Sequence, residues 1–510
     1  MSEVTAAALD PAAARKAARN ATALAIASIV GKGAFFLWQI MLSRLLTQSE
    51  YGIYGTIAGM VLIAGTLPEF GMGIIVLRDV ARHRDLAGKM LSATLVMQPA
   101  LGVVAYAGLI LAGLLLGYDE SIRGLLPLAG LTLFVNLLGT MVYNQLLARE
   151  QMMLPAVVSV VHILVLITLV AAALLGGLGL AGLYWATIAA GSLRALVFWL
   201  ALIQDGIRTV WPLDRAVVWG LLINGAPIAL IGFLGTAYQH VDKIITTATI
   251  GEEGTALLLL AFILVEGMIE LLSTTVLVAV FPMMSRQYGE GMLEAFDFLV
   301  SKLAYLTLVL MIPVGVTITF LAPAVVGLLF DARYAGVAQI LAVLIWYGVI
   351  RMVANVFGQV LLIQNRQRRL AVIRAAGLAL NIALLVTLLP RMGPVGAAVS
   401  SVIAEFVTTL VLVLQWEQVG EYCRRMRVRM LRLLLAGIGM ALAVLLLRDL
   451  SPAASPAWQQ LLPILTLVMG GVVYVGLAGL LGVIAPDDRG FIRQVLISMP
   501  GGSLVARVWR

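Results

Sequence analysis

Residues 22–43 read TALAIASIVGKGAFFLWQIMLS, an apolar run interrupted near its middle by a single cation, Lys32. An α-helix needs about 20 mainly apolar residues to cross the hydrocarbon core of a bilayer. The run is longer than the hydrophobic part of a signal peptide, and no convincing cleavage site follows it. It therefore predicts a first transmembrane helix, preceded by a basic cytoplasmic segment at residues 1–21.

Similar apolar runs recur along the whole chain. Of its 510 residues, 62% are hydrophobic and 12% are charged, whereas soluble domains carry about 25% charged residues. We count about fourteen spans, and none of the connections between them is long enough to hold a soluble domain. The sequence thus predicts an all-α integral membrane protein of the multi-pass type.

The net charge of +8 reflects the orientation of the chain in the membrane and does not indicate nucleic-acid binding. Most basic residues lie in every second loop between the apolar runs, and therefore on one side of the membrane, which is the positive-inside pattern. This pattern predicts cytoplasmic N- and C-termini in the cell (plasma) membrane and gives no reason to expect a nucleic-acid partner. The single cysteine, Cys423, cannot form an internal disulfide.

The chain contains a weak internal sequence repeat, which we call the internal echo. Pairs of residues recur at one constant separation: Gln145 with Gln359, Gly179 with Gly393, and Gly182 with Gly396. Two halves with an even number of spans would be parallel repeats about an axis along the membrane normal. The predicted organisation is an N-terminal segment (1–21), an N-lobe of helices 1–6 (22–203), a cytoplasmic connector (204–218), a C-lobe of helices 7–12 (219–416), a basic loop (417–430), helices 13–14 (431–484) and a cytoplasmic tail (485–510).

Four cations lie inside the predicted spans: Lys32, Arg194, Lys243 and Arg351. A charge at mid-bilayer costs about 2.5–3.5 kcal/mol on insertion scales, so such residues are rare and face a cavity or a partner. We interpret Lys32, Lys243 and Arg351 as candidate cavity cations for an anionic substrate. Arg194 receives no specific role.

Acidic residues and prolines inside the spans suggest sites of conformational change or ion coupling. Glu69, Asp242, Glu266 and Glu270 are candidates for gating or ion coupling, and Pro68 and Pro227 for helix kinks. Two interpretations stay open for Glu69, pairing with Lys32 or titration during transport. Glu266 and Glu270 could couple protons or pair with Arg351 or Lys243.

Two further expectations concern side chains. Asp242 and Lys243 are adjacent, so they should not face one another on a helix. Arg374 is expected to snorkel toward the cytoplasmic face.

Catalytic motifs are missing from the sequence. There is no Gly-rich P-loop, no HExxH motif and no cysteine cluster, so we expect a transporter without a cofactor rather than an enzyme. Its energy would come from a proton or sodium gradient, the membrane potential, a substrate gradient or a partner.

Six short motifs follow one another in order along the chain. They are Arg44-Leu45-Leu46, Glu50-Tyr51-Gly52-Ile53-Tyr54, Glu69-Phe70-Gly71 with Arg78, Pro227 with Val241-Asp242-Lys243, Phe281-Pro282, and Gly393-Pro394-Val395-Gly396-Ala397-Ala398. In this order they resemble the oligosaccharide flippases of polysaccharide biosynthesis, whose superfamily includes lipid II flippases and multidrug and toxin extrusion proteins.

The resemblance implies two six-helix lobes around a central cavity, two added C-terminal helices and alternating access. It also implies a polyprenyl-diphosphate-linked oligosaccharide as substrate, moved from the cytoplasmic to the outer leaflet of the lipid bilayer for surface polysaccharide biosynthesis. A polysaccharide polymerase and glycosyltransferases would be its partners.

Three alternatives remain. The first is a lipid II flippase of the same superfamily. The second is a cation-coupled drug exporter, which would favour an acidic cavity. The third is an antiporter-like subunit of a respiratory complex, which should carry intramembrane charges in both halves; here the echo pairs Arg351 with Leu137.

Overall fold

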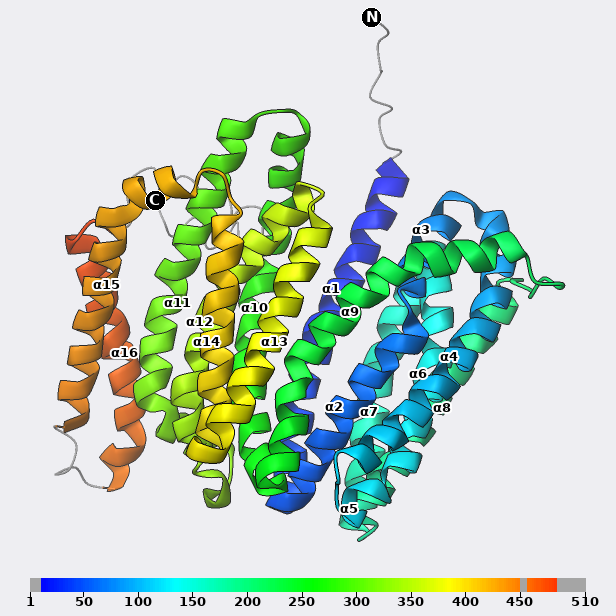
Figure 1. The fold of residues 1–510 in the computed structure, drawn as a ribbon, viewed down its shortest axis with the longest axis horizontal. Coiled ribbons are helices and arrows are strands. Elements are labelled where there is room, and N and C mark those ends of the chain that lie inside the picture. Colours follow the sequence, from blue (N-terminus) through cyan, green and yellow to red (C-terminus); the bar gives the residue numbers. More distant parts are fainter. Residues whose placement is uncertain (1–10, 450–455, 484–510) are drawn as a thin grey trace, which may run out of the picture. The chain divides into compact units, whose positions relative to one another are not determined.

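The computed structural model describes the backbone of residues 11–449 and 456–483, and side chains at 27–28, 30–269, 280–447 and 465–483. Every regular element in these ranges is helical (Figure 1). Eleven helical segments of the described part are long and apolar enough to cross a membrane. The predicted all-α membrane fold is confirmed.

Contacts between Cα atoms divide the chain into two compact units, unit 1 (Met1–Glu253) and unit 2 (Gly254–Arg510). Unit 1 contains α1 (Pro11–Leu45), α2 (Gln48–Glu69), α3 (Met72–Arg82), α4 (Ala87–Leu115), α5 (Glu120–Arg123), α6 (Leu126–Ala148), α7 (Met153–Leu175), α8 (Gly179–Gln204) and α9 (Arg215–Ile250). From α10 (Glu252–Gly289) onward the chain continues through α11 (Leu293–Leu329), α12 (Val337–Ile363), α13 (Gln367–Met392), α14 (Pro394–Leu414), α15 (Val419–Asp449) and α16 (Pro456–Leu480).

The boundary between the units differs from the connector expected at 204–218. Several contacts hold that connector against unit 1: Lys89 Nζ lies 3.0 Å from Asp214 Oδ2, and the Val210 amide donates to Ser92 Oγ at 2.7 Å. The following helix, α9, then packs along α2. By its contacts α9 therefore belongs with the first six spans, although the echo groups it with the second half.

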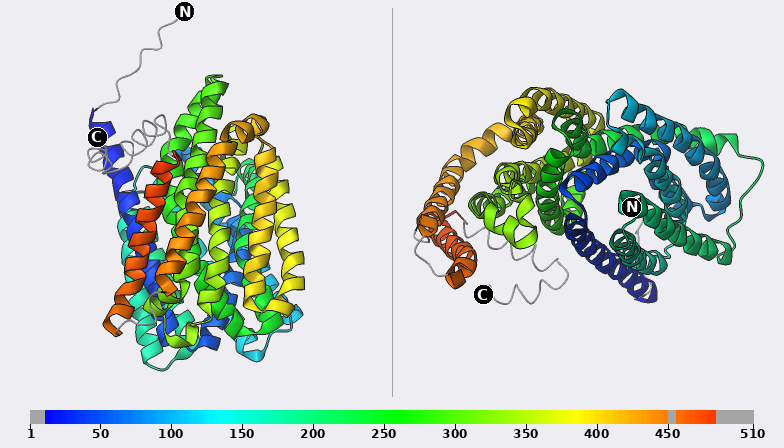
Figure 2. Two further views of the ribbon diagram at one scale, coloured as in Figure 1. Left: turned by 90° about the vertical axis from the view of Figure 1, so that its left-hand side faces the viewer. Right: turned by 90° about the horizontal axis from the view of Figure 1, so that it is seen from below.

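The internal echo has a structural counterpart within each unit. Gly179 and Gly393 both adopt positive φ, +56° and +59°, immediately before the bodies of α8 and α14. In unit 1, α8 packs against α6 and α7; in unit 2, α14 packs against α12 and α13, with which it lies side by side (Figure 2). A glycine with positive φ thus precedes the third helix of a three-helix arrangement in both halves.

The last two helices form an addition to unit 2. α15 and α16 lie side by side and pack on α11 (Figures 1 and 2). The Tyr305 hydroxyl donates to the Val483 carbonyl at 2.8 Å, and the Tyr474 hydroxyl donates to the Val309 carbonyl at 2.6 Å. These bonds satisfy buried hydroxyl groups that would otherwise destabilise an apolar interface.

The motif Glu50-Tyr51-Gly52-Ile53-Tyr54 has a structural explanation. Glu50 and Thr47 form a capping box at the start of α2. Tyr51 donates to Gln39 Oε1 at 2.8 Å, and Tyr54 accepts from Trp38 Nε1 at 3.1 Å, so both tyrosines fasten α2 to α1. A Cβ at Gly52 would overlap the backbone of Glu252, where α9 turns into α10.

The close approach at Gly52 predicts the effect of one added methyl group. Gly52→Ala should cost about 1–3 kcal/mol, because backbone atoms cannot move aside as a flexible side chain can. We expect the apparent melting temperature of the purified protein to fall by several degrees. Gly220→Ala in α9 is the matched control, since nothing lies within 4 Å of its Cβ position. Equal melting temperatures for the two variants would contradict the proposed contact.

Candidate functional site

The most concentrated group of intramembrane charges lies in unit 2 and consists of Arg351, Arg374 and Glu405, which we call the Glu405 cluster. The Glu405 carboxylate is 0% exposed. Arg351 Nη1 donates to both of its oxygens, at 3.1 and 3.3 Å, and Arg374 Nη1 donates to one, at 3.2 Å. Two guanidinium groups therefore compensate one buried carboxylate, which leaves the three side chains with a net charge of +1.

Small residues on α14 allow the helices of this cluster to approach. Ala397, Ala398, Ser401 and Ala404 are buried. A side chain at Gly377 of α13 would collide with Thr408 of α14. This close packing brings α13 near enough for Arg374 to reach Glu405. The expectation that Arg374 snorkels to the surface is wrong, because its guanidinium group instead donates to the buried Glu405 carboxylate.

α10 contributes a second carboxylate near the cluster. Gly348 of α12 fits tightly against Val265 and Ile269, and the Phe262 and Tyr347 rings meet edge to face at 5.8 Å. This contact places Glu266 within electrostatic reach of Tyr347, as are Arg351, Arg374 and Glu405. The side chain of Glu270 lies outside the described residues.

Glu405 is a site residue that the sequence analysis did not single out. A lone acidic residue in the apolar run of α14 could have identified Glu405 as a site residue, because a charge in a membrane span requires a partner. The sequence could not identify that partner, since Arg351 and Arg374 lie on two other helices.

Asp242 and Lys243 lie on α9, and each is 1% exposed. Lys243 Nζ is 3.3 Å from Asp242 Oδ1 and also donates to the Gln239 carbonyl. The expectation that the adjacent side chains do not meet is wrong, because the long lysine chain folds back along the helix. The result is a compact, locally compensated ion pair.

Glu69 lies where α2 ends. A kink was expected at Pro68; instead the helix stops, because Phe70 and Gly71 adopt left-handed φ values of 45° and 67° before α3 begins. Glu69 Oε2 accepts from the Gly71 amide at 3.2 Å. Among the described side chains no ion pair joins Glu69 to Lys32. Glu69 thus caps a break in the membrane-spanning segment.

The broken helix lies against the segment of α9 that contains Pro227. Gly71 lies against Ile228 and the Gly225 carbonyl, so a side chain at residue 71 could not be accommodated. Pro227, between these two contacts, lies inside α9, whose helical structure continues from Arg215 to Ile250. The helix break at Gly71 and the proline-containing segment of α9 are therefore in direct contact within unit 1.

Lys32 and Arg194 take different places in unit 1. Lys32 is half-buried on α1, which packs on α7. Arg194 of α8 donates to Asn136 Oδ1 of α6 at 2.9 Å and lies close to His162 of α7. Arg194 thus links α8 to α6, which gives it a structural role.

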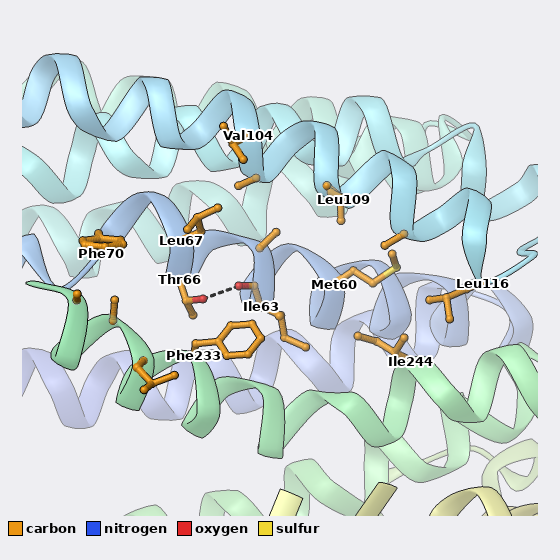
Figure 3. Close-up of a pocket in the computed structure, with 17 residues that line it drawn as sticks. Met60, Ile63, Thr66, Leu67, Phe70, Val104, Leu109, Leu116, Phe233 and Ile244 are labelled. Carbon is orange, nitrogen blue, oxygen red and sulfur yellow. Dashed lines mark hydrogen bonds between the residues drawn. The ribbon is translucent and has the colours of Figure 1, made fainter. Parts of the chain in front are cut away.

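An apolar cavity of about 630 Å³ lies between α2, α4 and α9 (Figure 3). Phe70 lines one end, Leu116 and Ile244 line the other, and Phe233 points in from α9. Its only side-chain hydroxyl, Thr66 Oγ1, already donates to the Ile63 carbonyl at 2.7 Å. With no charged residue in its lining, the cavity suits hydrocarbon and not an anionic group.

The contacts of the Glu405 cluster predict an order of stability loss. Glu405→Gln should be most damaging, by roughly 3–5 kcal/mol, because two buried arginines lose their counter-charge. Arg351→Met should follow, since Arg351 contacts both carboxylate oxygens. Arg374→Met should cost least.

The order can be measured by thermal unfolding of the purified variants in detergent. Asp331→Asn, which breaks an exposed ion pair with Arg333, is the control and should leave the melting temperature nearly unchanged. An Arg374→Met variant as unstable as Glu405→Gln would refute the assignment of the stronger pair to Arg351.

Two family models match the chain. The model described as polysaccharide biosynthesis protein matches residues 17–287, and that of the lipid II flippase MurJ matches residues 222–457. An uncharacterized membrane protein of Methanocaldococcus jannaschii is 23% identical over 198 residues, which cover 39% of this chain and 37% of that protein. A probable lipid II flippase MurJ of Bdellovibrio bacteriovorus is 24% identical over 320 residues, 59% of either chain. The chain thus aligns with less than two thirds of each relative.

Solved structures share the fold at low sequence identity. A lipid II flippase MurJ in an inward closed conformation has a TM-score of 0.72 at 13% identity, covering 90% of this chain and 98% of that one. An inward-facing MATE family multidrug transporter has a TM-score of 0.59 at 15% identity, covering 77% and 96%. A transporter of the same MOP superfamily from Pyrococcus furiosus has a TM-score of 0.54 at 16% identity, covering 78% and 94%. The predicted transporter fold is confirmed, and, since its family model matches more than half of the chain, this multi-pass membrane protein belongs to the polysaccharide biosynthesis protein family.

Proposed function

We propose that this protein is a flippase that moves a polyprenyl-diphosphate-linked oligosaccharide from the cytoplasmic to the outer leaflet by alternating access. The family match over residues 17–287 carries the proposal, because it links the chain to polysaccharide biosynthesis. The transporter fold supplies the mechanism class. Cytoplasmic termini, and cooperation with a polymerase and glycosyltransferases, are parts of the same proposal.

The intramembrane cations support an anionic head group. Each unit has its own cations within the spans, with Lys32 in unit 1 and Arg351 and Arg374 in unit 2. Positively charged side chains attract a diphosphate in a site too polar for lipid. Lys243 is the weaker candidate, because its ammonium is already enclosed with Asp242.

The acidic residues make separate contributions to the proposed cycle. Glu69 is the best candidate for gating, since it caps the helix break between α2 and α3, where the backbone departs from helical geometry. Asp242, Glu266 and Glu270 remain candidates for coupling to a proton or sodium gradient or to the membrane potential. No resident cofactor is part of this proposal.

A lipid II flippase is the second candidate function, and two observations favour it. The MurJ model matches residues 222–457, and the Bdellovibrio bacteriovorus relative is named as a probable lipid II flippase. Both substrates share a polyprenyl diphosphate and differ in their glycan. The shared chemistry explains why cations alone do not separate them.

Reconstitution into proteoliposomes distinguishes the two candidates. Fluorescently labelled polyprenyl-diphosphate oligosaccharide and labelled lipid II are incorporated into separate proteoliposomes. A membrane-impermeant quencher removes the fluorescence of label in the outer leaflet only. Translocation is therefore measured as the decrease in the fraction of fluorescence that the quencher cannot reach. Selective movement of the oligosaccharide lipid supports the proposal, whereas selective movement of lipid II establishes the alternative. Movement of neither, by protein of native melting temperature, would refute both.

Lys32 provides a variant that tests the cation hypothesis. Lys32→Gln should lower the translocation rate at least about tenfold, since an anionic head group loses a charged partner in a low-dielectric site. Lys32→Arg should retain most activity. Asp331→Asn serves as the exposed control at matched reconstitution levels. Wild-type rates for Lys32→Gln would remove Lys32 from the proposed head-group site.

A further inference from the structure

A second cavity, of about 490 Å³, lies in unit 2 at the start of α13. It is lined by Asn365, Arg366, Arg368, Arg369, Val372, Ile373 and Gln415. Its polar side chains are three arginines and two amides, and no carboxylate is among the lining residues. The cavity therefore offers hydrogen-bond donors and positive charge to whatever enters it.

The charges of this cavity are only partly compensated. Arg366 pairs with Glu417 at 3.0 Å. Arg368 and Arg369 are exposed, and neither side chain has an ion pair or hydrogen bond with any described residue. Both occupy the first turn of α13, which contains no acidic residue, so the positive end of the helix dipole adds to their charge. An anion would offset this local excess of positive charge.

Apolar residues lie one helical turn beyond the arginines. Val372 follows Arg368 by four residues, and Ile373 follows Arg369 by four, so each pair shares one face of α13. Val372 is 62% exposed, although valine is costly to leave in water. A charged group next to an exposed apolar stripe matches the boundary between lipid head groups and hydrocarbon.

We propose that this cavity binds a phosphate-bearing lipid. Arg368 and Arg369 contact the phosphate, Asn365 and Gln415 donate to its remaining oxygens, and the hydrocarbon chain lies over Val372 and Ile373. Guanidinium groups suit phosphate because their donors are planar and permanently charged. The site lies at the start of α13, and none of its lining residues belongs to the Glu405 cluster.

Lipid titration of the full-length purified protein, followed by native mass spectrometry, tests the proposal. The probes are phosphatidylglycerol, polyprenyl diphosphate, zwitterionic phosphatidylcholine and inorganic diphosphate. Wild-type protein should bind at least one of the two anionic lipids more tightly than phosphatidylcholine. Arg368→Gln/Arg369→Gln should weaken that binding roughly 30-fold, and Arg368→Gln alone about 5-fold. The anionic lipid whose binding is weakened in the double variant is the source of the phosphate.

The matched control is Arg82→Gln/Arg84→Gln, which removes the same charge from exposed arginines on the predicted cytoplasmic side. It should leave lipid affinity within about twofold, because neither arginine lines the cavity and only diffuse, salt-screened attraction is lost. Val372→Gln should weaken lipid binding and leave inorganic diphosphate binding unchanged. Wild-type lipid binding by the double arginine variant, equal losses in the control, or an unaffected lipid affinity in Val372→Gln would each overturn the proposal.

Discussion

A charge inside hydrocarbon must find its counter-charge within the protein, because no water is available to solvate it. This constraint explains the contacts of the charged side chains in the described spans. Glu405 is fully buried and bound by Arg351 and Arg374, Asp242 is bound by Lys243, and Arg194 donates to Asn136. Where the chain leaves helical geometry, at Phe70 and Gly71, Glu69 caps the released Gly71 amide.

The compensation differs between the two units, and that difference matters for function. The Asp242–Lys243 pair joins two residues of one helix, and the pair has no net charge. The Glu405 cluster extends over three helices and carries an excess positive charge, to which Glu266 adds an opposing field from a fourth. An interaction shared among helices responds when those helices move, whereas a pair within one helix does not. The Glu405 cluster is therefore the better candidate for coupling charge to conformation.

Helix ends and glycines fix how these groups are placed. Gly377 allows α13 to approach Thr408 of α14, and Gly348 allows α12 to approach α10. Gly71 lies against α9 beside Pro227, next to the cavity that Phe70 lines (Figure 3). The motif residues around Gly52 hold α1, α2 and the end of α9 together and do not contact a site. Resemblance in such motifs thus reflects shared packing as much as shared chemistry.

The sequence by itself determined the membrane class, the approximate spans and the cations worth attention, because hydrophobic length and isolated charges are local properties that the bilayer selects directly. It also indicated the repeated turns at Gly179 and Gly393, which both require positive φ. Only the tertiary structure decided which charges meet. Glu405 received no role in the sequence, Arg374 was expected at the surface, and Lys243 was expected to face away from Asp242. Each outcome depends on the approach of helices, or on the path of a flexible side chain, which no local pattern encodes. For the same reason only the structure showed that α9 packs with the first six spans and that Arg368 and Arg369 border a cavity.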